Sequence, residues 1–221
     1  MNMPKMAVIG GTGALGGGLA KRLARGGYEV AIGSRDAGRA AEAAARIARE
    51  TGSKMVSGTD NVSAAAGADV VFVTVPFASQ VMTLADIAPV VTGKIVVDTT
   101  VPLVPPKVAR VQLPPQGSAA AIAAETLGSQ VRLVTGFHNV SATKLGAHGE
   151  TGCDVLVFGD DVEAREQVVA ITNQLGVRAL HGGPLANAVA AEAMTSLLIA
   201  IKKRYKIEEG AGIVITGIPR Q

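Results

Sequence analysis

Short apolar runs alternate along the chain with longer stretches in which apolar residues recur every three or four positions. The short runs show no polar alternation, as is typical of strands buried on both faces. These predicted strands span residues 5–10, 28–33, 54–57, 69–75, 94–98, 132–135, 154–158 and 177–180. The predicted helices span residues 13–25, 36–51, 61–66, 77–88, 118–127, 162–175 and 185–203. This alternation predicts an α/β fold with a doubly wound parallel sheet and right-handed crossovers.

A glycine cluster stands between the first predicted strand and the first predicted helix. Gly11, Gly13 and Gly16 give the spacing G-x-G-x-x-G in the strand–turn–helix context of a dinucleotide site. Gly11 would permit the tight turn, Gly13 would let a pyrophosphate approach the backbone, and Gly16 would let helix and strand pack closely. Free N–H groups at the helix start would then hold the phosphates. We therefore expect a Rossmann-type nucleotide-binding fold; a purely structural turn is the alternative.

The end of the second predicted strand distinguishes between the two nicotinamide nucleotides. Units that bind NAD usually carry Asp or Glu there, which bonds the ribose 2′-hydroxyl. This chain has Ser34 and Arg35 at that place, and Arg39 follows one helical turn later. A hydroxyl and two cations suit a 2′-phosphate, so the sequence predicts NADP. Two alternatives stay open: Asp36 could serve a 2′-hydroxyl, and the two arginines could form a solvated helix face.

A proline-rich segment and an apolar helix mark the second half of the chain. Residues 102–115 hold five of the ten prolines and predict a long loop, which either drapes over a ligand or bridges two halves of the fold. Residues 185–201 are apolar around nearly the whole circumference, which predicts a buried helix and suggests a dimer interface. We expect a Rossmann-type domain over residues 1–181. A C-terminal helix and tail over residues 182–221 would add a second-ligand pocket and dimer contacts.

The composition narrows the partners and the compartment. Hydrophobic residues make up 48 % of the chain and charged residues 18 %, which favours a sizeable core over disorder. A net charge of +3 suits a small anionic ligand and does not indicate nucleic acid. The single cysteine, Cys153, excludes an internal disulfide and a cysteine-rich metal site, so we expect a cytoplasmic protein. The first strand begins at once and no apolar run reaches about 18 residues, so we expect no signal peptide and no membrane span.

The common acid–base signatures of nicotinamide enzymes are missing. Tyr28 and Tyr205 have no Lys four positions on, and neither have Asn139 and Asn187. His138 follows a predicted strand and would point toward the ligand crevice, although a structural loop histidine fits as well. We therefore predict no catalytic side chain and no metal site. Direct hydride exchange between two planar redox cofactors needs only alignment of donor and acceptor carbons about 3–3.5 Å apart.

The order of short motifs along the chain resembles that of one known family. The motifs are Gly10-Gly11-Thr12-Gly13, Ile32-Gly33-Ser34-Arg35, Thr74-Val75-Pro76-Phe77, Gly136-Phe137-His138-Asn139, Gly159-Asp160-Asp161 and Gly183-Pro184-Leu185. In these motifs, and over nearly its whole length, the chain resembles the NADPH-dependent deazaflavin reductases, which use the 8-hydroxy-5-deazaflavin coenzyme F420. The resemblance implies reversible hydride transfer between nicotinamide C4 and deazaflavin C5, by a homodimer.

The resemblance also implies the residues of both ligand sites. In addition to Gly11 of the glycine motif, NADP would contact Thr12, Gly13, Ala14, Leu15, Ser34, Arg35, Arg39, Thr74, Val75, Pro76 and Phe77. The deazaflavin would lie near Val101, Pro102, His138, Asn139, Ser141, Ala142 and the last helix or tail. The chain departs from the family in its longer proline-rich loop and in Phe77, where a Trp is familiar. Both departures border the second-ligand pocket.

Two other functions remain open at this point. The acceptor could be another small molecule, such as an imine, a pyrroline or a ferric chelate, because related folds reduce these. A non-catalytic NADP-binding redox sensor would also lack a catalytic side chain, although the sequence shows no appended module for protein or DNA binding.

Overall fold

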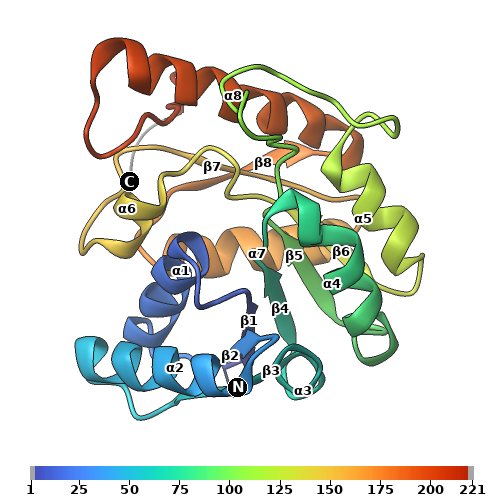
Figure 1. Ribbon diagram of the computed structural model, residues 1–221, viewed down its shortest axis with the longest axis vertical. Coiled ribbons are helices and arrows are strands. Elements are labelled where there is room, and N and C mark those ends of the chain that lie inside the picture. Colours follow the sequence, from blue (N-terminus) through green and yellow to red (C-terminus); the bar gives the residue numbers. More distant parts are fainter. Residues whose placement is uncertain (1–2, 219–221) are drawn as a thin grey trace.

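The apolar runs of the sequence pair into one eight-stranded sheet with the order β3-β2-β1-β4-β5-β6-β7-β8 (Figure 1). The structure, a computed structural model, describes residues 3–218. The strands are β1 (Met6–Ile9), β2 (Val30–Ser34), β3 (Val56–Asp60), β4 (Val70–Val73), β5 (Ile95–Asp98), β6 (Arg132–Thr135), β7 (Val155–Phe158) and β8 (Ala179–Gly183). The predicted α/β class is confirmed, and the buried runs of β1, β4 and β5 form the centre of the sheet.

Helices cover both faces of the sheet. They are α1 (Ala14–Arg25), α2 (Ala37–Thr51), α3 (Asn61–Ala66), α4 (Gln80–Ile87), α5 (Ala119–Leu127), α6 (Ala142–Gly146), α7 (Val162–Gln174) and α8 (Ala188–Tyr205). Side chains of α1, α2 and α7 form the core on one face, and those of α3, α4 and α5 form the core on the other. The last helix, α8, packs against α5 and β7.

The last two strands run opposite to the first six. From β3 to β6 all neighbours pair in parallel, whereas β7 pairs antiparallel with β6 through Thr135 and Phe158. β8 is parallel to β7. The doubly wound arrangement is therefore confirmed for the first six strands, and the reversal is a feature that the sequence pattern did not indicate. As a result, β7 and β8 begin at the edge where the other strands end.

Pairing between strands shifts some of the predicted boundaries. The third strand was expected at residues 54–57, but β3 follows the register of β2, in which Ser34 lies beside Asp60. The last strand was expected at residues 177–180 and lies two to three residues later, opposite β7. The short helix α6 was not predicted. The proline-rich residues 102–115 form no helix or strand, as expected.

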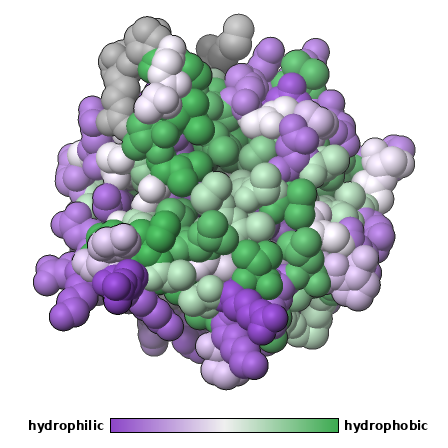
Figure 2. Space-filling view, turned by 90° about the horizontal axis from the view of Figure 1, so that it is seen from above, coloured by the Kyte–Doolittle hydropathy of each residue, from purple (hydrophilic) through white to green (hydrophobic). Residues whose placement is uncertain are grey.

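α8 leaves part of its apolar surface exposed in the single chain. Met194, Leu197 and Ile201 are 37, 47 and 41 % exposed. The face of the molecule that carries α8 shows a broad apolar area between hydrophilic residues (Figure 2). Burial of the whole circumference, as the sequence predicted, is therefore not reached within one chain.

The same helix changes the expectation about membrane spans. By length and composition alone, the segment Leu185–Tyr205, with a mean hydropathy of 1.4, could cross a membrane. The expectation that no apolar run is long enough was therefore wrong. The finding is weak support for a membrane span, because core helices of soluble proteins pass the same test.

Candidate functional site

The turn between β1 and α1 is built from glycines that leave no room for a Cβ atom. A Cβ atom at Gly16 would collide with Thr74 Oγ1 and would lie 2.7 Å from the carbonyl oxygen of Gly10. One at Gly11 would lie 2.8 Å from the carbonyl oxygen of Val8. The packing role predicted for Gly16 is confirmed. The left-handed backbone conformation, with φ of 79°, belongs to Gly10 and not to Gly11, so the tight turn is made one residue earlier than expected.

α1 begins without a cap. Gly13 occupies the N-cap position, no described side chain bonds to the first N–H groups, and the first turn holds no acidic residue. Gly13 and Ala14 are exposed. The first N–H groups of any helix lack partners within it, and the helix dipole favours an anion there. The start of α1 is therefore open to a phosphate group.

The segment after β2 shows how Asp36 is used. Its carboxylate caps α2 by accepting a hydrogen bond from the backbone N–H of Arg39 at 3.1 Å. Ser34 Oγ accepts one from the backbone N–H of Asp36 at 3.3 Å. The side chains of Arg35 and Arg39 are exposed and form no ion pair within residues 3–218. This geometry argues against Asp36 as a partner of a ribose 2′-hydroxyl and leaves two cations beside Ser34.

Polar groups fix the ends of β4 and β5. Thr74 Oγ1 donates a hydrogen bond to the carbonyl oxygen of Ile9 at 2.8 Å, which ties β4 to β1. Asp98 is 1 % exposed and accepts hydrogen bonds from Thr100, from its backbone N–H at 3.1 Å and its hydroxyl at 2.6 Å. Burial raises the pKa of Asp98 to about 6, although its hydrogen bonds act in the opposite direction. These bonds hold the turn that leads into Val101–Pro102.

The turn after β6 carries a buried histidine. Phe137 has a φ of 63°, which is uncommon for a residue other than glycine. His138 is 6 % exposed, and neither ring nitrogen has a hydrogen-bond partner in the described part of the chain. Burial lowers the pKa of His138 to about 4, so the ring is neutral at pH 7. Unpaired buried polar atoms are uncommon in native folds, which makes this turn a candidate for ligand contact.

A buried polar network between α4, α5 and α8 is a site that sequence reasoning missed. Glu192, 1 % exposed, accepts hydrogen bonds from the backbone N–H groups of Ala119 at 2.7 Å and Ala120 at 2.9 Å. Gln80 Nε2 donates to Asp98 at 2.6 Å and to the carbonyl oxygen of Ala119 at 2.9 Å. Burial raises the pKa of Glu192 to about 7, and the charge of Asp98 adds to this shift. The available signal was that Glu192 is the one charged residue among residues 188–201.

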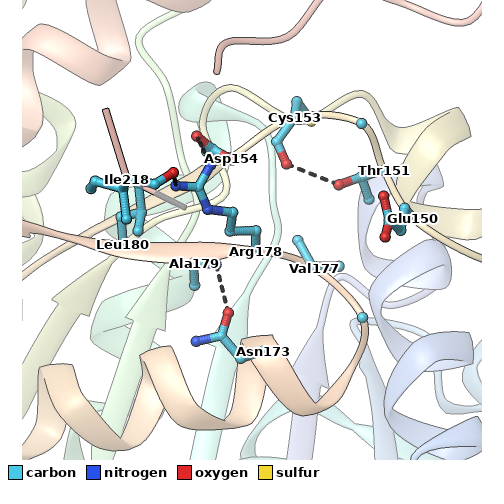
Figure 3. A pocket seen from close by; sticks show the side chains of 12 residues that line it. Glu150, Thr151, Cys153, Asp154, Asn173, Val177, Arg178, Ala179, Leu180 and Ile218 are labelled. Atoms are coloured by element: carbon cyan, nitrogen blue, oxygen red, sulfur yellow. Dashed lines mark hydrogen bonds and ion pairs between the residues drawn. The ribbon is translucent and has the colours of Figure 1, made fainter. Parts of the chain in front are cut away.

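A cavity of about 470 Å³ lies away from the glycine turn, between the segment before β7 and the start of β8 (Figure 3). Three of its polar side chains, Asn173, Arg178 and Asp154, already have partners. Asn173 Oδ1 accepts a hydrogen bond from the N–H of Ala179, and Arg178 pairs with Asp154 at 3.3 Å. Asp154 also accepts one from the N–H of Ile215 at 2.6 Å. The cavity therefore adjoins the attachment of the C-terminal segment and contains none of the predicted site residues.

The predicted site residues all come to one edge of the sheet, at the carboxyl ends of β1, β2, β4, β5 and β6. In that order they are Gly11 to Leu15, then Ser34, Arg35 and Arg39, then Thr74 to Phe77, then Val101 and Pro102, then His138, Asn139, Ser141 and Ala142. Doubly wound sheets bind ligands at this edge. Three strands separate β2 from β6, so the arginines and the His138 turn occupy opposite ends of it. The described residues contain no group of three or more His, Cys, Asp or Glu side chains that could hold a metal.

Comparisons with known proteins point in one direction. Residues 5–102 match the family model described as NADP oxidoreductase, coenzyme F420-dependent. The chain is 42 % identical to the F420-dependent NADP reductase of Methanothermobacter thermautotrophicus, over 98 % of this chain and 97 % of the relative. It is 37 % identical to the F420-dependent NADP reductase of Methanocaldococcus jannaschii, over 97 % of this chain and 99 % of the relative.

A solved structure gives the same picture. It comes from Arthrobacter sp. FB24 and is assigned as an F420-dependent NADP-reductase. It superposes with a TM-score of 0.82 at 26 % identity, and the match covers 97 % of this chain and 100 % of that one. The likeness therefore extends over both the sheet and α8.

Proposed function

Because this chain belongs to the family of coenzyme F420-dependent NADP oxidoreductases, we propose that it transfers a hydride directly and reversibly between NADP(H) and an 8-hydroxy-5-deazaflavin. When both are bound, the nicotinamide C4 and the deazaflavin C5 exchange the hydride, and the reduced deazaflavin also takes up one proton. The observation that carries the proposal is that the predicted site residues lie together along one edge of the sheet, at the carboxyl ends of its strands. This edge has an uncapped helix start and two exposed arginines at one end and a buried histidine turn at the other.

The NADP half consists of the glycine turn and the ends of β2 and β4. The open start of α1 offers N–H groups to the pyrophosphate, and Thr12 to Leu15 line this start. Arg35, Arg39 and the Ser34 hydroxyl would bind the 2′-phosphate, since guanidinium groups match phosphate geometry. Thr74 to Phe77, which follow β4, would then border the nicotinamide end.

The second-ligand half consists of the turns after β5 and β6. Val101 and Pro102 follow the turn that Asp98 holds, and Asn139, Ser141 and Ala142 follow His138. The neutral imidazole of His138 can both donate and accept a hydrogen bond. Its two ring nitrogens are buried, so in this proposal the turn as a whole, and not the ring, borders the deazaflavin. The chain contains no Trp, so the remaining surface for the flat ring is aliphatic and backbone.

The exposed face of α8 supports a homodimer. Met194, Leu197 and Ile201 form an apolar stripe that a second copy would cover. In this proposal residues 1–181 form the dinucleotide-binding domain, and residues 182–221 add dimer contacts and part of the second-ligand pocket. The enzyme would act in the cytoplasm on its two small-molecule partners, without nucleic acid or a membrane. Gel filtration with light scattering would show a dimer, and a clean monomer would contradict this assignment.

The two alternative functions have less support. A reductase of an imine, a pyrroline or a ferric chelate, and a redox sensor, would both fit the NADP half alone. Neither explains why two F420-dependent NADP reductases match this chain over nearly their whole length.

The function is tested by mixing the protein with NADPH and a deazaflavin without oxygen and recording the deazaflavin absorbance. We expect bleaching of the deazaflavin in a one-to-one ratio with NADPH consumed. Intact NADPH binding without bleaching would favour one of the two alternatives.

A further inference from the structure

A single turn of α8 contacts two segments near the ligand edge, the His138–Asn139 turn and the start of α5. Asn139 Nδ2 donates a hydrogen bond to the carbonyl oxygen of Ala191 at 2.9 Å. Thr195 Oγ1 donates to the carbonyl oxygen of His138, also at 2.9 Å. Between these two positions on the helix lies Glu192. This turn of α8 therefore binds the His138–Asn139 turn, and its buried Glu192 carboxylate faces the start of α5.

The carboxylate of Glu192 binds the start of α5, where the proline-rich loop ends. Its two oxygens accept the N–H groups of Ala119 and Ala120. The hydrogen bonds continue through the side-chain amide of Gln80. Its Nε2 donates both to the carbonyl oxygen of Ala119 and to the carboxylate of Asp98. Asp98 in turn holds Thr100, at the start of the segment that leads to Val101. A continuous path of bonds thus runs from α8 to the end of β5.

We propose that Glu192 is a positioning residue, which fixes the position of the turn after β5 relative to the His138–Asn139 turn. The proposal rests on the proposed function, in which these two turns border the nicotinamide end of NADP and the deazaflavin. Hydride transfer requires the two carbons to be aligned closely, so a small shift between the turns would slow transfer without weakening the distant phosphate contacts.

The chemistry of the site explains why a carboxylate stands at position 192. Ala119 and Ala120 are at most 1 % exposed, so solvent does not reach their N–H groups. Two buried donors need two acceptor atoms, and the two carboxyl oxygens of Glu192 supply them. An amide supplies one acceptor and turns an NH₂ donor toward the other N–H group. Glu192→Gln therefore keeps the shape of the side chain and breaks one of the two bonds.

The test compares Glu192→Gln with Glu166→Gln, a matched control whose glutamate is exposed on α7. We expect Glu192→Gln to lower kcat/KM for the deazaflavin about tenfold, on the scale of one charged hydrogen bond. The Kd for NADPH, measured by fluorescence titration, should stay within about twofold of the wild type. Glu166→Gln should change neither quantity.

A second measurement uses the ligand-free protein. Hydrogen–deuterium exchange in Glu192→Gln should become faster at Ala119–Ala120 and also at two remote places, Thr99–Val101 and Asn139–Val140. Faster exchange at Ala119–Ala120 alone, together with an unchanged kcat/KM, would reduce Glu192 to a local cap and overturn the proposal.

Two further arrangements keep the test decisive. If Glu192→Gln does not fold, Asp98→Asn perturbs the other end of the network. Faster exchange at Ala119–Ala120 in that variant supports the path, and a change confined to Thr100 refutes it. The exchange measurement needs no deazaflavin, so a wild type that fails to bleach deazaflavin would disprove the proposed function, while the exchange pattern would still decide the role of Glu192.

Discussion

Two helices, α1 and α5, begin at the same edge of the sheet, and they treat their free N–H groups in opposite ways. The start of α1 is uncapped, glycine-rich and exposed. At α5, Ser118 Oγ accepts from the N–H of Ala121, and Glu192 accepts from the two N–H groups before it. Both starts carry the same dipole, so the dipole alone does not make an anion site. We expect the start of α1 to bind a ligand because the protein leaves it open, and the start of α5 not to bind one because the carboxylate of Glu192 fills it.

This contrast also separates two kinds of positioning. In the proposed function, the open start of α1 would bind the pyrophosphate. The filled start of α5 cannot contact a ligand phosphate and serves the alignment of the two turns beside it. Variants at the first site should therefore change NADPH affinity, and variants at the second should change turnover or stability.

The largest effect is expected from Gly16→Ala, which would displace the open start of α1. The added Cβ atom would collide with Thr74 Oγ1 and lie 2.7 Å from the backbone oxygen of Gly10, so α1 must move. Overpacking of this kind costs about 1–3 kcal/mol or more, and we expect NADPH affinity to fall about 100-fold. The control is Gly17→Ala, whose Cβ atom would meet its nearest neighbour at an ordinary 3.5 Å. A folded Gly16→Ala variant with wild-type NADPH affinity would refute the role of the glycine turn.

A smaller effect is expected at the far end of the same site. If Arg35 binds the 2′-phosphate as proposed, Arg35→Ala would remove one charge-assisted hydrogen bond, so the Kd for NADPH should rise about ten- to a hundredfold. The Kd for NADH, which lacks this phosphate, should not change. Arg49→Ala, an exposed arginine in the last turn of α2, serves as the control. Equal losses for NADPH and NADH would show that Arg35 acts through the fold and not through the phosphate.

The smallest effect is expected at the filled start of α5. It would appear in how the free energy of unfolding depends on pH. The pKa of Glu192 is raised from 4.5 to about 7 in the folded protein, so the folded state binds more protons than the unfolded state between these values. The resulting stability is fully present below the unfolded pKa and is lost as the pH rises through about 7. Between pH 6 and 8 the free energy of unfolding of the wild type should fall by about 1 kcal/mol more than that of Glu192→Gln.

Urea unfolding of both proteins at pH 6, 7 and 8 measures this difference. Asp98 shifts the wild-type curve in the same direction, and His138 shifts it in the opposite direction because its pKa is lowered. Both groups remain in Glu192→Gln, and because the charge of Asp98 acts on Glu192, the comparison measures Glu192 together with its interaction with Asp98. Parallel curves for the two proteins would show that Glu192 does not titrate in this range.

The sequence predicted what depends on local pattern. The buried runs gave the strands, the prolines gave the long loop, and Ser34 and Arg35 stand at the end of β2 as expected. The boundaries of β3 and β8 were displaced because pairing with a neighbouring strand decides them, and that information lies elsewhere in the chain. The contacts of the individual site residues with NADP and the deazaflavin stay predictions.

The filled start of α5 could not be predicted for a related reason. Ala119 and its acceptor Glu192 are 73 residues apart, and they meet only because α8 packs across α5. The reversal of β7 likewise depends on a single pairing, between Thr135 and Phe158, that no periodicity encodes. Burial of α8 failed as a prediction within one chain because a hydrophobic pattern does not specify whether the covering surface belongs to the same molecule.

The most direct test of the central claim follows a labelled hydride. NADPH carrying deuterium at the transferred C4 position is mixed with the wild-type protein and a deazaflavin, and the reduced deazaflavin is analysed by mass spectrometry and NMR. Direct transfer predicts one deuterium at C5 of the deazaflavin and none in the solvent. Reduced deazaflavin with solvent hydrogen at C5, or NADPH that binds and is never oxidised, would contradict the account.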